Sequence, residues 1–214
     1  NMRGLNSPAR RNAIRQVVQT VNPVVVCLQE IKLELVTVDI VRHCLGNRFE
    51  NFYYMPADGT RGGIAIAWDA LLASLSNPHT THTTLTALVK PSEAQEWWLT
   101  CVYGPQLDHE KVEFLEELVE IRDLHAGPWM LAGDFNLIYE ARDKNNHNLN
   151  RRLMGRFRMA IDSAGLRQIK CSNRRFTWSN ERENPTLVSI DKFFCNIHWE
   201  ALFPRTLLMA ASHA

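Results

Sequence analysis

Apolar runs of strand length that end in polar residues place the strongest constraint on how this chain can fold. Residues 24–30 (VVVCLQE) and 129–136 (WMLAGDFN) each carry an apolar stretch, and each stretch ends in carboxylate or amide side chains. An apolar run without polar alternation is typical of a strand that is buried on both faces, as in α/β proteins. The sequence therefore predicts an α/β fold whose strand ends carry polar groups.

Helical and strand-like segments alternate along the chain. Ser7 and Pro8 mark the start of a helix that Asn22 and Pro23 end. Further helices are predicted around residues 112–119 and 154–161, where apolar residues recur at helical spacing. Strands are predicted at 24–30, 62–68, 84–90, 97–105 (broken by Gly104 and Pro105) and 129–135, with short ones near 175–179, 188–194 and 206–210 and a turn region at 77–84.

The length and the absence of repeats favour one domain. We find no internal repeat, low-complexity tract or long linker in the 214 residues, which suffice for one large core. The organisation predicted is a single domain over residues 1–214. Because the sequence starts at Asn1 without a methionine and stops abruptly at Ala214, this domain is expected to be incomplete at both ends.

The charge balance excludes a globally basic nucleic-acid binder. Lys and Arg number 24 against 23 Asp and Glu, which gives a net charge of +1. A polyanion would therefore have to be bound by a local patch. The candidate basic clusters comprise Arg10, Arg11, Arg151, Arg152, Arg156, Arg174 and Arg175. Any single one of these arginines is more often a solvated surface charge than a binding residue.

Cysteine spacing and hydropathy indicate the compartment. The five cysteines are odd in number and widely spaced, which favours reduced thiols over a disulfide framework or a zinc site. The sequence has no signal-peptide h-region and no apolar run of about 18 residues, so no membrane span is expected. We therefore expect a soluble protein in a reducing, intracellular compartment.

The polar strand ends suit phosphodiester chemistry. Glu30, Tyr103 and Asp134 each follow an apolar strand, and alternation along a strand would turn Asn136 to the same side as Asp134 and Phe135 to the core. Hydrolysis of a phosphodiester needs a hard divalent cation on carboxylates, a group that orients water, and donors to the phosphoryl oxygens. Taken singly, each residue is more often a turn or strand-end residue, and only their joint occurrence favours a site.

Seven ordered blocks resemble the endonuclease/exonuclease/phosphatase superfamily. They are NMRGLN (1–6), LQE (28–30), GGIAIAW (62–68), VYGP (102–105), GDFN (133–136), TWSN (177–180) and SID (189–191). Among its members, the chain is most similar to the apurinic/apyrimidinic-type endonuclease domain of plant LINE (non-LTR) retrotransposons. The resemblance implies an α/β, DNase I-like four-layer sandwich of two mixed β-sheets flanked by helices. It also implies magnesium-dependent nicking of DNA, with Mn2+ as a possible substitute for Mg2+.

The resemblance assigns roles position by position. It makes Glu30 the metal-binding glutamate, with Asn1 supporting the metal site. It places Tyr103 beside the scissile phosphate and makes Asp134 the residue that orients the nucleophile. Asn136 would stabilise the charge that develops in the reaction. The remaining roles fall on Asp191, which would buttress a histidine, on His213 as that histidine, and on Thr177 near the DNA backbone. Independently of the resemblance, the basic clusters add Arg174 and Arg175 as candidate substrate-binding residues.

The chain departs from the family at one position. The family closes its site with Ser-Asp-His, whereas this sequence reads Ala211-Ser212-His213. If His213 is the family's histidine, the aspartate is either replaced by Ser212 or deleted, and a hard oxygen ligand is missing in both cases. A hydroxyl is a much weaker partner for a divalent cation than a carboxylate, so a nearly complete but impaired site is expected.

Three functions remain open. The first is a magnesium-dependent DNA endonuclease of a LINE-type element, expected in the nucleus when functional, whose parent protein could carry a reverse transcriptase. The second is a catalytically dead remnant with weak DNA binding. The third is a phosphatase of the same superfamily that acts on a small phosphoester. DNA is the expected partner in the first two, and no membrane or obligate protein partner is expected.

Overall fold

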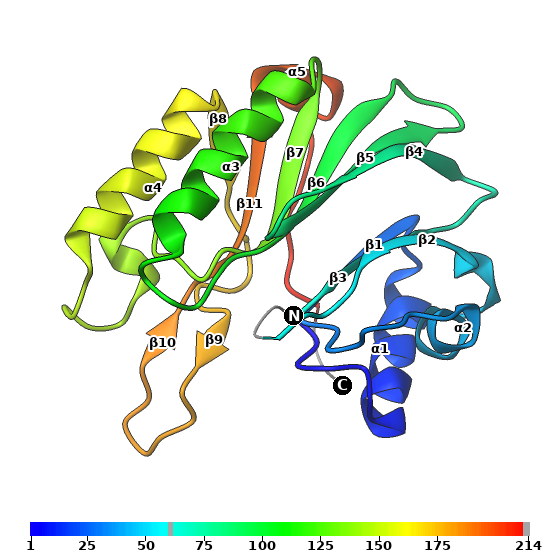
Figure 1. Ribbon diagram of the computed structural model, residues 1–214, viewed down its shortest axis with the longest axis horizontal. Coiled ribbons are helices and arrows are strands. Elements are labelled where there is room, and N and C mark those ends of the chain that lie inside the picture. The colour runs from blue at the N-terminus through cyan, green and yellow to red at the C-terminus, as the bar shows by residue number, and fades with distance from the viewer. Residues whose placement is uncertain (60–61, 212–214) are drawn as a thin grey trace. The chain divides into compact units, whose positions relative to one another are not determined.

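The computed structural model describes residues 1–59 and 62–211, which group into two compact units. Unit 1 comprises Asn1–Tyr103 together with Ala211, and unit 2 comprises Gly104–Ala210. Each unit combines strands with helices (Figure 1). The single-domain organisation stays a prediction.

Unit 1 begins with helices that cover a three-stranded antiparallel sheet of order β1-β3-β2. Its buried cluster joins Leu5, Val18 and Val41 to strand residues such as Ala65 and Ala67, so the helices pack on one face of this sheet. The elements are α1 (Pro8–Val21), β1 (Val25–Gln29), α2 (Val38–Leu45), η1 (Asn47–Phe49), β2 (Asn51–Met55) and β3 (Ile64–Trp68).

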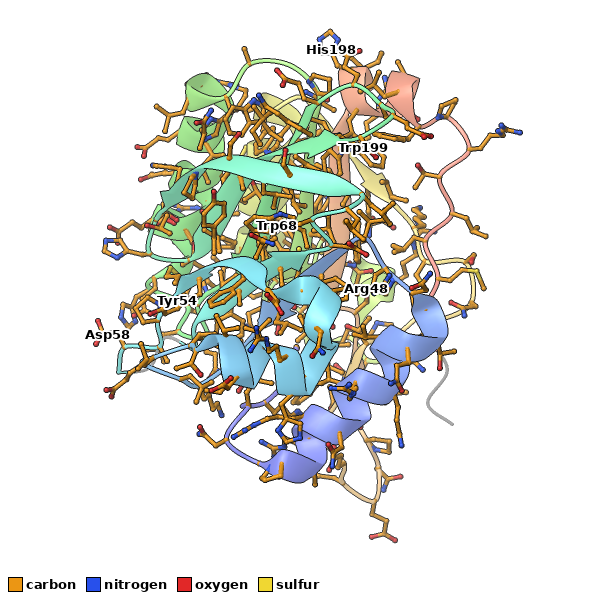
Figure 2. All side chains as sticks on the ribbon, turned by 90° about the vertical axis from the view of Figure 1, so that its right-hand side faces the viewer. Arg48, Tyr54, Asp58, Trp68, His198 and Trp199 are labelled. Atoms are coloured by element: carbon orange, nitrogen blue, oxygen red, sulfur yellow. The ribbon has the colours of Figure 1, made fainter. Side chains whose placement is uncertain are left out.

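A second set of strands in unit 1 packs against this sheet. The strands β4 (Ala73–Thr80), β5 (Thr84–Pro91) and β6 (Trp97–Tyr103) are antiparallel neighbours, and β3 lies against all three. Trp68 lies at the end of β3 and is labelled in Figure 2. Its ring packs on the ring of Tyr53, with the two centroids 5.1 Å apart. Unit 1 is thus a layer of helices, a sheet, and a second set of strands.

Unit 2 combines three antiparallel strands, in the order β7-β11-β8, with helices. Helices α3 and α4 lie side by side, and α4 packs on β8 (Figure 1). The elements are α3 (Lys111–Leu124), β7 (Trp129–Asp134), η2 (Ala141–Asp143), α4 (Arg151–Ser163), β8 (Leu166–Ile169), β9 (Trp178–Ser179), β10 (Leu187–Val188), β11 (Asp191–Asn196) and α5 (Ile197–Leu202).

An aromatic cluster forms the core of unit 2. Phe135 is fully buried, and its ring lies 5.3 Å from that of Phe194 and 5.4 Å from that of Phe157. The Phe135 and Phe194 rings meet edge to face, an arrangement that adds stability beyond the burial of their area. The prediction that Phe135 turns into the core is confirmed, and Trp129 is buried as its apolar strand predicted.

Several elements differ from the sequence prediction. The predicted turn at 77–84 is shorter, because β4 runs to Thr80 with an irregularity between Ser76 and His79 that absorbs its polar residues. Helix α2 and strand β2 were not predicted. The strand predicted near 206–210 is only a parallel bridge between Leu208 and Cys171.

The fold class is confirmed as α/β, with a mixed β-sheet core flanked by helices. All five cysteines are free thiols, as their spacing predicted. Over residues 1–59 and 62–211, no helix has the length and hydropathy that a membrane crossing requires.

Candidate active site

Glu30 lies immediately after β1 in a strained backbone conformation. Its φ of +55° falls in the left-handed region, which costs a non-glycine residue energy and is often retained at functional sites. The Glu30 carbonyl accepts a hydrogen bond from Gly4 N at 2.8 Å, which holds the turn in place. The Glu30 carboxylate is 12% exposed and pairs with Lys32 Nζ at 3.0 Å.

Gly62 brings Glu30 and Tyr103 together within unit 1. A Cβ added at Gly62 would lie 2.8 Å from Tyr103 Cε1 and 3.0 Å from Glu30 Cγ. Both side chains therefore approach the same glycine, and only a residue without a side chain leaves them room. Gly62 belongs to the GGIAIAW block, but sequence analysis did not recognise this role.

Asn1 lies beside the same segment. Its backbone nitrogen is 3.2 Å from Gln29 Oε1, and Gln29 donates from Nε2 to Cys101 Sγ at 3.0 Å. The Asn1 side-chain oxygen accepts from Arg3 N at 3.3 Å. Unit 1 thus brings together three of the predicted site residues, namely Asn1, Glu30 and Tyr103.

Asp134 and Asn136 lie side by side in unit 2, but not through strand alternation. Strand β7 ends at Asp134, and Asn136 adopts a φ of +48° outside the strand. Asn136 N donates to Asp134 Oδ1 at 2.8 Å, which makes a side-chain turn of the kind that Asp favours. Asn136 Nδ2 donates to the Gly104 carbonyl at 2.8 Å. The backbone N–H and the side-chain amide of Asn136 are therefore both held in place.

Asp191 lies directly opposite Asp134 in the antiparallel pairing of β11 with β7. Directly opposed residues place their Cβ atoms roughly 4.5–5.5 Å apart on the same face of a sheet. Asp134 is buried and Asp191 is partly exposed, so the carboxylate pair lies at the margin of the sheet.

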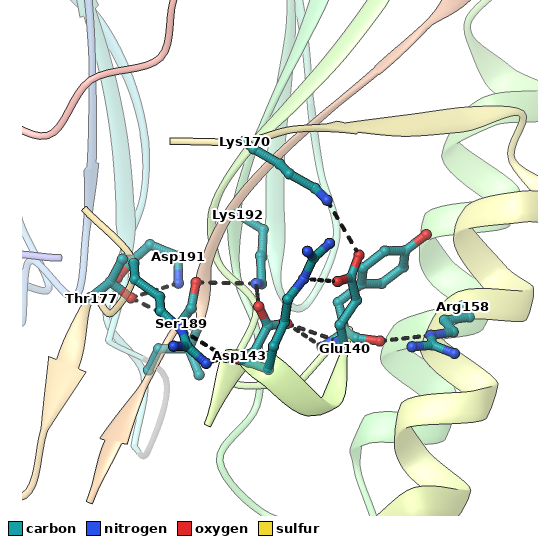
Figure 3. Close-up of polar contacts among 12 residues, drawn as sticks. Glu140, Asp143, Arg158, Lys170, Thr177, Ser189, Asp191 and Lys192 are labelled. Atoms are coloured by element: carbon teal, nitrogen blue, oxygen red, sulfur yellow. Dashed lines mark hydrogen bonds and ion pairs between the residues drawn. The ribbon is translucent and has the colours of Figure 1, made fainter. Parts of the chain in front are cut away.

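Thr177 holds the segment that leads into Asp191. Its Oγ1 accepts from both Ile190 N and Asp191 N at 3.1 Å (Figure 3). The Thr177 backbone N donates to the Val188 carbonyl at 2.9 Å. The structure therefore gives this exposed threonine a fixed relation to Asp191, although its predicted contact with DNA stays a prediction.

Gly104 makes a close backbone approach in the same region. Its N–H donates to the Asp134 carbonyl at 2.7 Å, and a Cβ added there would lie 2.4 Å from the Phe135 carbonyl oxygen. No side chain fits at this distance, because the clashing atoms belong to the backbone. The sequence pattern indicated Gly104 only as the end of a strand.

The predicted basic clusters include arginines that serve the fold. Arg11 Nε donates to the Leu5 carbonyl at 2.7 Å, and Arg175 Nη2 donates to the Arg142 carbonyl at 3.0 Å. The Arg175 guanidinium also lies 4.7 Å from the ring centroid of Phe176. Arg174 is exposed, and His213, the predicted catalytic histidine, lies outside the described residues.

Unit 1 offers hard oxygen donors of the type that divalent cations such as magnesium bind. Within residues 1–59 and 62–211, no group of three or more His, Cys, Asp or Glu side chains is placed to hold a metal. Magnesium needs no such cage, since it keeps several waters and binds through one or two carboxylates plus substrate phosphates. Glu30 and the Asn1 amide oxygen supply hard oxygen donors of this kind.

Solved structures share the fold of this chain. The endonuclease domain of TRAS1, a telomere-specific non-LTR retrotransposon, superposes with a TM-score of 0.66 at 14% identity over 87% of this chain and 79% of that one. The AP endonuclease LMAP from Leishmania major has a TM-score of 0.66 at 18% identity over 92% and 78%. The 3′ phosphatase NExo from Neisseria, bound to a product DNA hairpin, has a TM-score of 0.73 at 18% identity over 92% and 84%.

Sequence comparison gives the family. No curated protein matches the chain. The model of the Endonuclease/Exonuclease/phosphatase family matches residues 1–212, which is nearly the whole sequence. The chain therefore belongs to the Endonuclease/Exonuclease/phosphatase family.

Proposed function

We propose that this chain hydrolyses phosphodiester bonds in DNA with Mg2+, as the endonuclease domain of a LINE-type retrotransposon protein. The observation that carries the proposal is the opposition of Asp134 and Asp191, with Asn136 turned back onto Asp134. Two carboxylates on one face are unfavourable for stability alone, because like charges directly opposite each other repel. Such an arrangement is typical of a site that serves chemistry.

Each residue of unit 2 has a role in this proposal. Asp134 orients the attacking water and accepts its proton, because its carboxylate is buried and held by the Asn136 amide N–H. The Asn136 side chain donates to negative charge that develops on the phosphoryl oxygens. Asp191 buttresses and orients the catalytic histidine, for which His213 is the candidate.

Glu30 and Asn1 are the proposed ligands of the ion, and Tyr103 the proposed phosphate contact. When bound, Mg2+ would neutralise charge on the phosphate and on the leaving oxygen. The Glu30 carboxylate would release Lys32 to bind the ion, since the Lys32 side chain is half exposed and its ammonium can return to solvent. The Tyr103 hydroxyl would donate to a phosphate oxygen.

The retrotransposon assignment rests on sequence blocks rather than on the fold. The blocks RGLNSPARR (3–11) and TWSN (177–180) resemble the LINE branch, whereas the fold is equally that of repair endonucleases and phosphatases. Ser212 in the place of the family's aspartate predicts lower activity than an intact member would have.

A plasmid-nicking assay tests the proposal. The chain is incubated with supercoiled plasmid and Mg2+, and EDTA in a parallel arm should abolish the relaxed product. Glu30→Ala and Asp134→Asn should each lower the nicking rate by about 10²-fold or more. Glu34→Ala and Asp123→Asn are matched controls, because both side chains are exposed.

The double variant of Glu30→Ala with Asp134→Asn tests whether the two residues act in one reaction. Residues that act as a unit give strongly non-additive losses, so the double variant should lose little more than either single one. Nicking that survives Glu30→Ala would overturn the assignment of that residue. Cleavage of a soluble phosphoester without nicking would favour the phosphatase function, and neither reaction in the wild type would favour a dead remnant.

A further inference from the structure

A buried ion pair lies behind the strand end that carries Asp191. Lys192 Nζ pairs with Asp143 Oδ1 at 2.8 Å, and their side chains are 1% and 11% exposed. Lys192 Nζ also donates to Ser189 Oγ at 3.1 Å (Figure 3). Burial lowers the pKa of Lys192, and the Asp143 carboxylate opposes this shift. A charge is rarely buried so completely unless it is paired.

Asp143 uses its second carboxylate oxygen to hold a short helix. Asp143 Oδ2 accepts from Tyr139 N at 3.0 Å and from Glu140 N at 2.9 Å, which completes a capping box at η2. The Asp143 carbonyl accepts from Ser189 N at 2.7 Å. Asp143 therefore connects η2 to the segment that enters β11 through two side-chain oxygens and one backbone oxygen.

Lys192 and Asp191 project from opposite faces of β11, because side chains alternate along a strand. On the Lys192 side, the strand partner is Gly133, which has no side chain to compete for the space. On the Asp191 side, the strand partner is Asp134 and the backbone is held by Thr177 Oγ1. One strand end is thus fixed from both faces.

We propose that the Lys192–Asp143 pair is a positioning device that holds the Asp191 carboxylate opposite Asp134. Neither Lys192 nor Asp143 needs to touch a substrate in this role. Removal of the ammonium would leave the Asp143 carboxylate buried without its ionic partner and would break the contact with Ser189 Oγ, which loosens the segment from Ser189 to Asp191. The role of Asp191 rests on the proposed function, whereas its fixed position does not.

Amide hydrogen exchange followed by NMR tests the positioning without any substrate. In Lys192→Met, which keeps the length of the side chain, exchange of the Ile190 and Asp191 amides should accelerate at least about tenfold. The amides of Leu131 and Ala132 in β7 should keep their rates. Lys170→Met is the matched control, since Lys170 is exposed and lies 3.8 Å from Glu140 in the same network.

A second variant separates positioning from stability. Lys192→Met combined with Asp143→Asn removes both charges but retains an oxygen to cap η2, so thermal stability should recover relative to Lys192→Met alone. The exchange rates at Ile190 and Asp191 should stay raised, and the nicking rate constant kcat should stay at least about tenfold below wild type with KM little changed.

Unchanged exchange at Ile190 and Asp191 in Lys192→Met would overturn the inference, as would equal acceleration throughout β7. Recovery of kcat together with stability in the double variant would overturn it as well, because the pair would then act only on folding. A wild-type protein without nicking activity would instead contradict the proposed function, and the exchange rates would still decide the role of Lys192.

Discussion

Asp134 and Asp191 face each other across the antiparallel strands β7 and β11. A directly opposed pair of like charges destabilises a sheet by about 0.2–1 kcal/mol relative to a neutral pair. The fold tolerates this cost at a strand end where Asn136 N and Gly104 N contact the side chain and the carbonyl of Asp134.

The opposition predicts that Asp191→Asn separates stability from activity. The substitution removes one of two facing charges, so the melting temperature should rise by about 1–3 °C for a chain of this size. The nicking rate should fall. Calorimetry and the plasmid assay on the same preparation measure both effects, with Asp123→Asn as an exposed control. A lower melting temperature would show that Asp191 makes a stabilising contact that outweighs the repulsion.

Gly104→Ala should destabilise the protein because its new Cβ would lie 2.4 Å from the Phe135 carbonyl oxygen. Overpacking against atoms that cannot yield costs about 1–3 kcal/mol of unfolding free energy. Urea denaturation measures the change.

Gly155→Ala is the matched control for this substitution. Gly155 lies inside α4, and an added Cβ would meet no atom within 4 Å. Because alanine favours the helix more than glycine does, this variant should gain up to about 1 kcal/mol. Equal effects at the two glycines would contradict the close approach at Gly104.

Thiol reactivity should single out Cys171. Burial raises the pKa of Cys44 and of Cys195 to about 11, and both side chains are buried. A hydrogen bond with Cys101 and burial raise the pKa of Cys27 as well. At pH 8 an aromatic disulfide reagent should therefore label one thiol fast, and Cys171→Ser should remove that phase. Several fast thiols in the native protein would contradict this burial.

The same pKa shifts predict an alkaline loss of stability. The thiols of Cys44 and Cys195 ionise near pH 9 in the unfolded chain and near pH 11 in the folded one. Between these values the unfolded state binds fewer protons, so the free energy of unfolding falls as pH rises. Urea denaturation at pH 8.5 and pH 10.5 should show the decrease, and Cys44→Ala should make it smaller. An equal decrease in Cys44→Ala would exclude this thiol as its source.

Lys32→Met should tighten the binding of a divalent cation. Its ammonium pairs with Glu30 at 3.0 Å and must be displaced before the carboxylate binds an ion. Because the Lys32 partner is half exposed, the pair contributes about 0–1 kcal/mol, so the Kd for Mn2+, measured by electron paramagnetic resonance, should fall up to about fivefold. Lys90→Met, from the exposed pair with Glu96, is the control. Weaker binding would show that Lys32 supports the ion pocket.

Ser212→Asp should raise the nicking rate. This change restores the carboxylate that the family has before the residue matched by His213. A carboxylate is a stronger partner than a hydroxyl for a hard cation, so the gain should appear in Mg2+ and disappear with EDTA. No gain would indicate that the missing carboxylate does not limit the reaction.

The local pattern predicted the strands whose apolar runs are long. The strands predicted at 24–30 and 62–68 are observed at Val25–Gln29 and Ile64–Trp68, and Phe135 lies in the core as predicted. The pattern failed where polar residues fill a strand, as in β4, because an exposed edge tolerates them. It also failed for α2, because eight residues are too few for the helical spacing of apolar residues to be told from a loop.

The site was predictable in its residue types but not in its geometry. Asp134 and Asn136 were found by their spacing, yet a left-handed turn at Asn136 and not strand alternation brings them together. Lys192 and Asp143 are 49 positions apart, so no local pattern links them, and only folding reveals the pair.

The close approach at Gly104 also limits what mutation can do to this sequence. Any missense change in a glycine codon adds at least a Cβ, and here that atom meets the backbone of Phe135. A gene copy that drifts without selection can therefore yield a destabilised product through this one codon, whereas at Gly155 an added Cβ has open space.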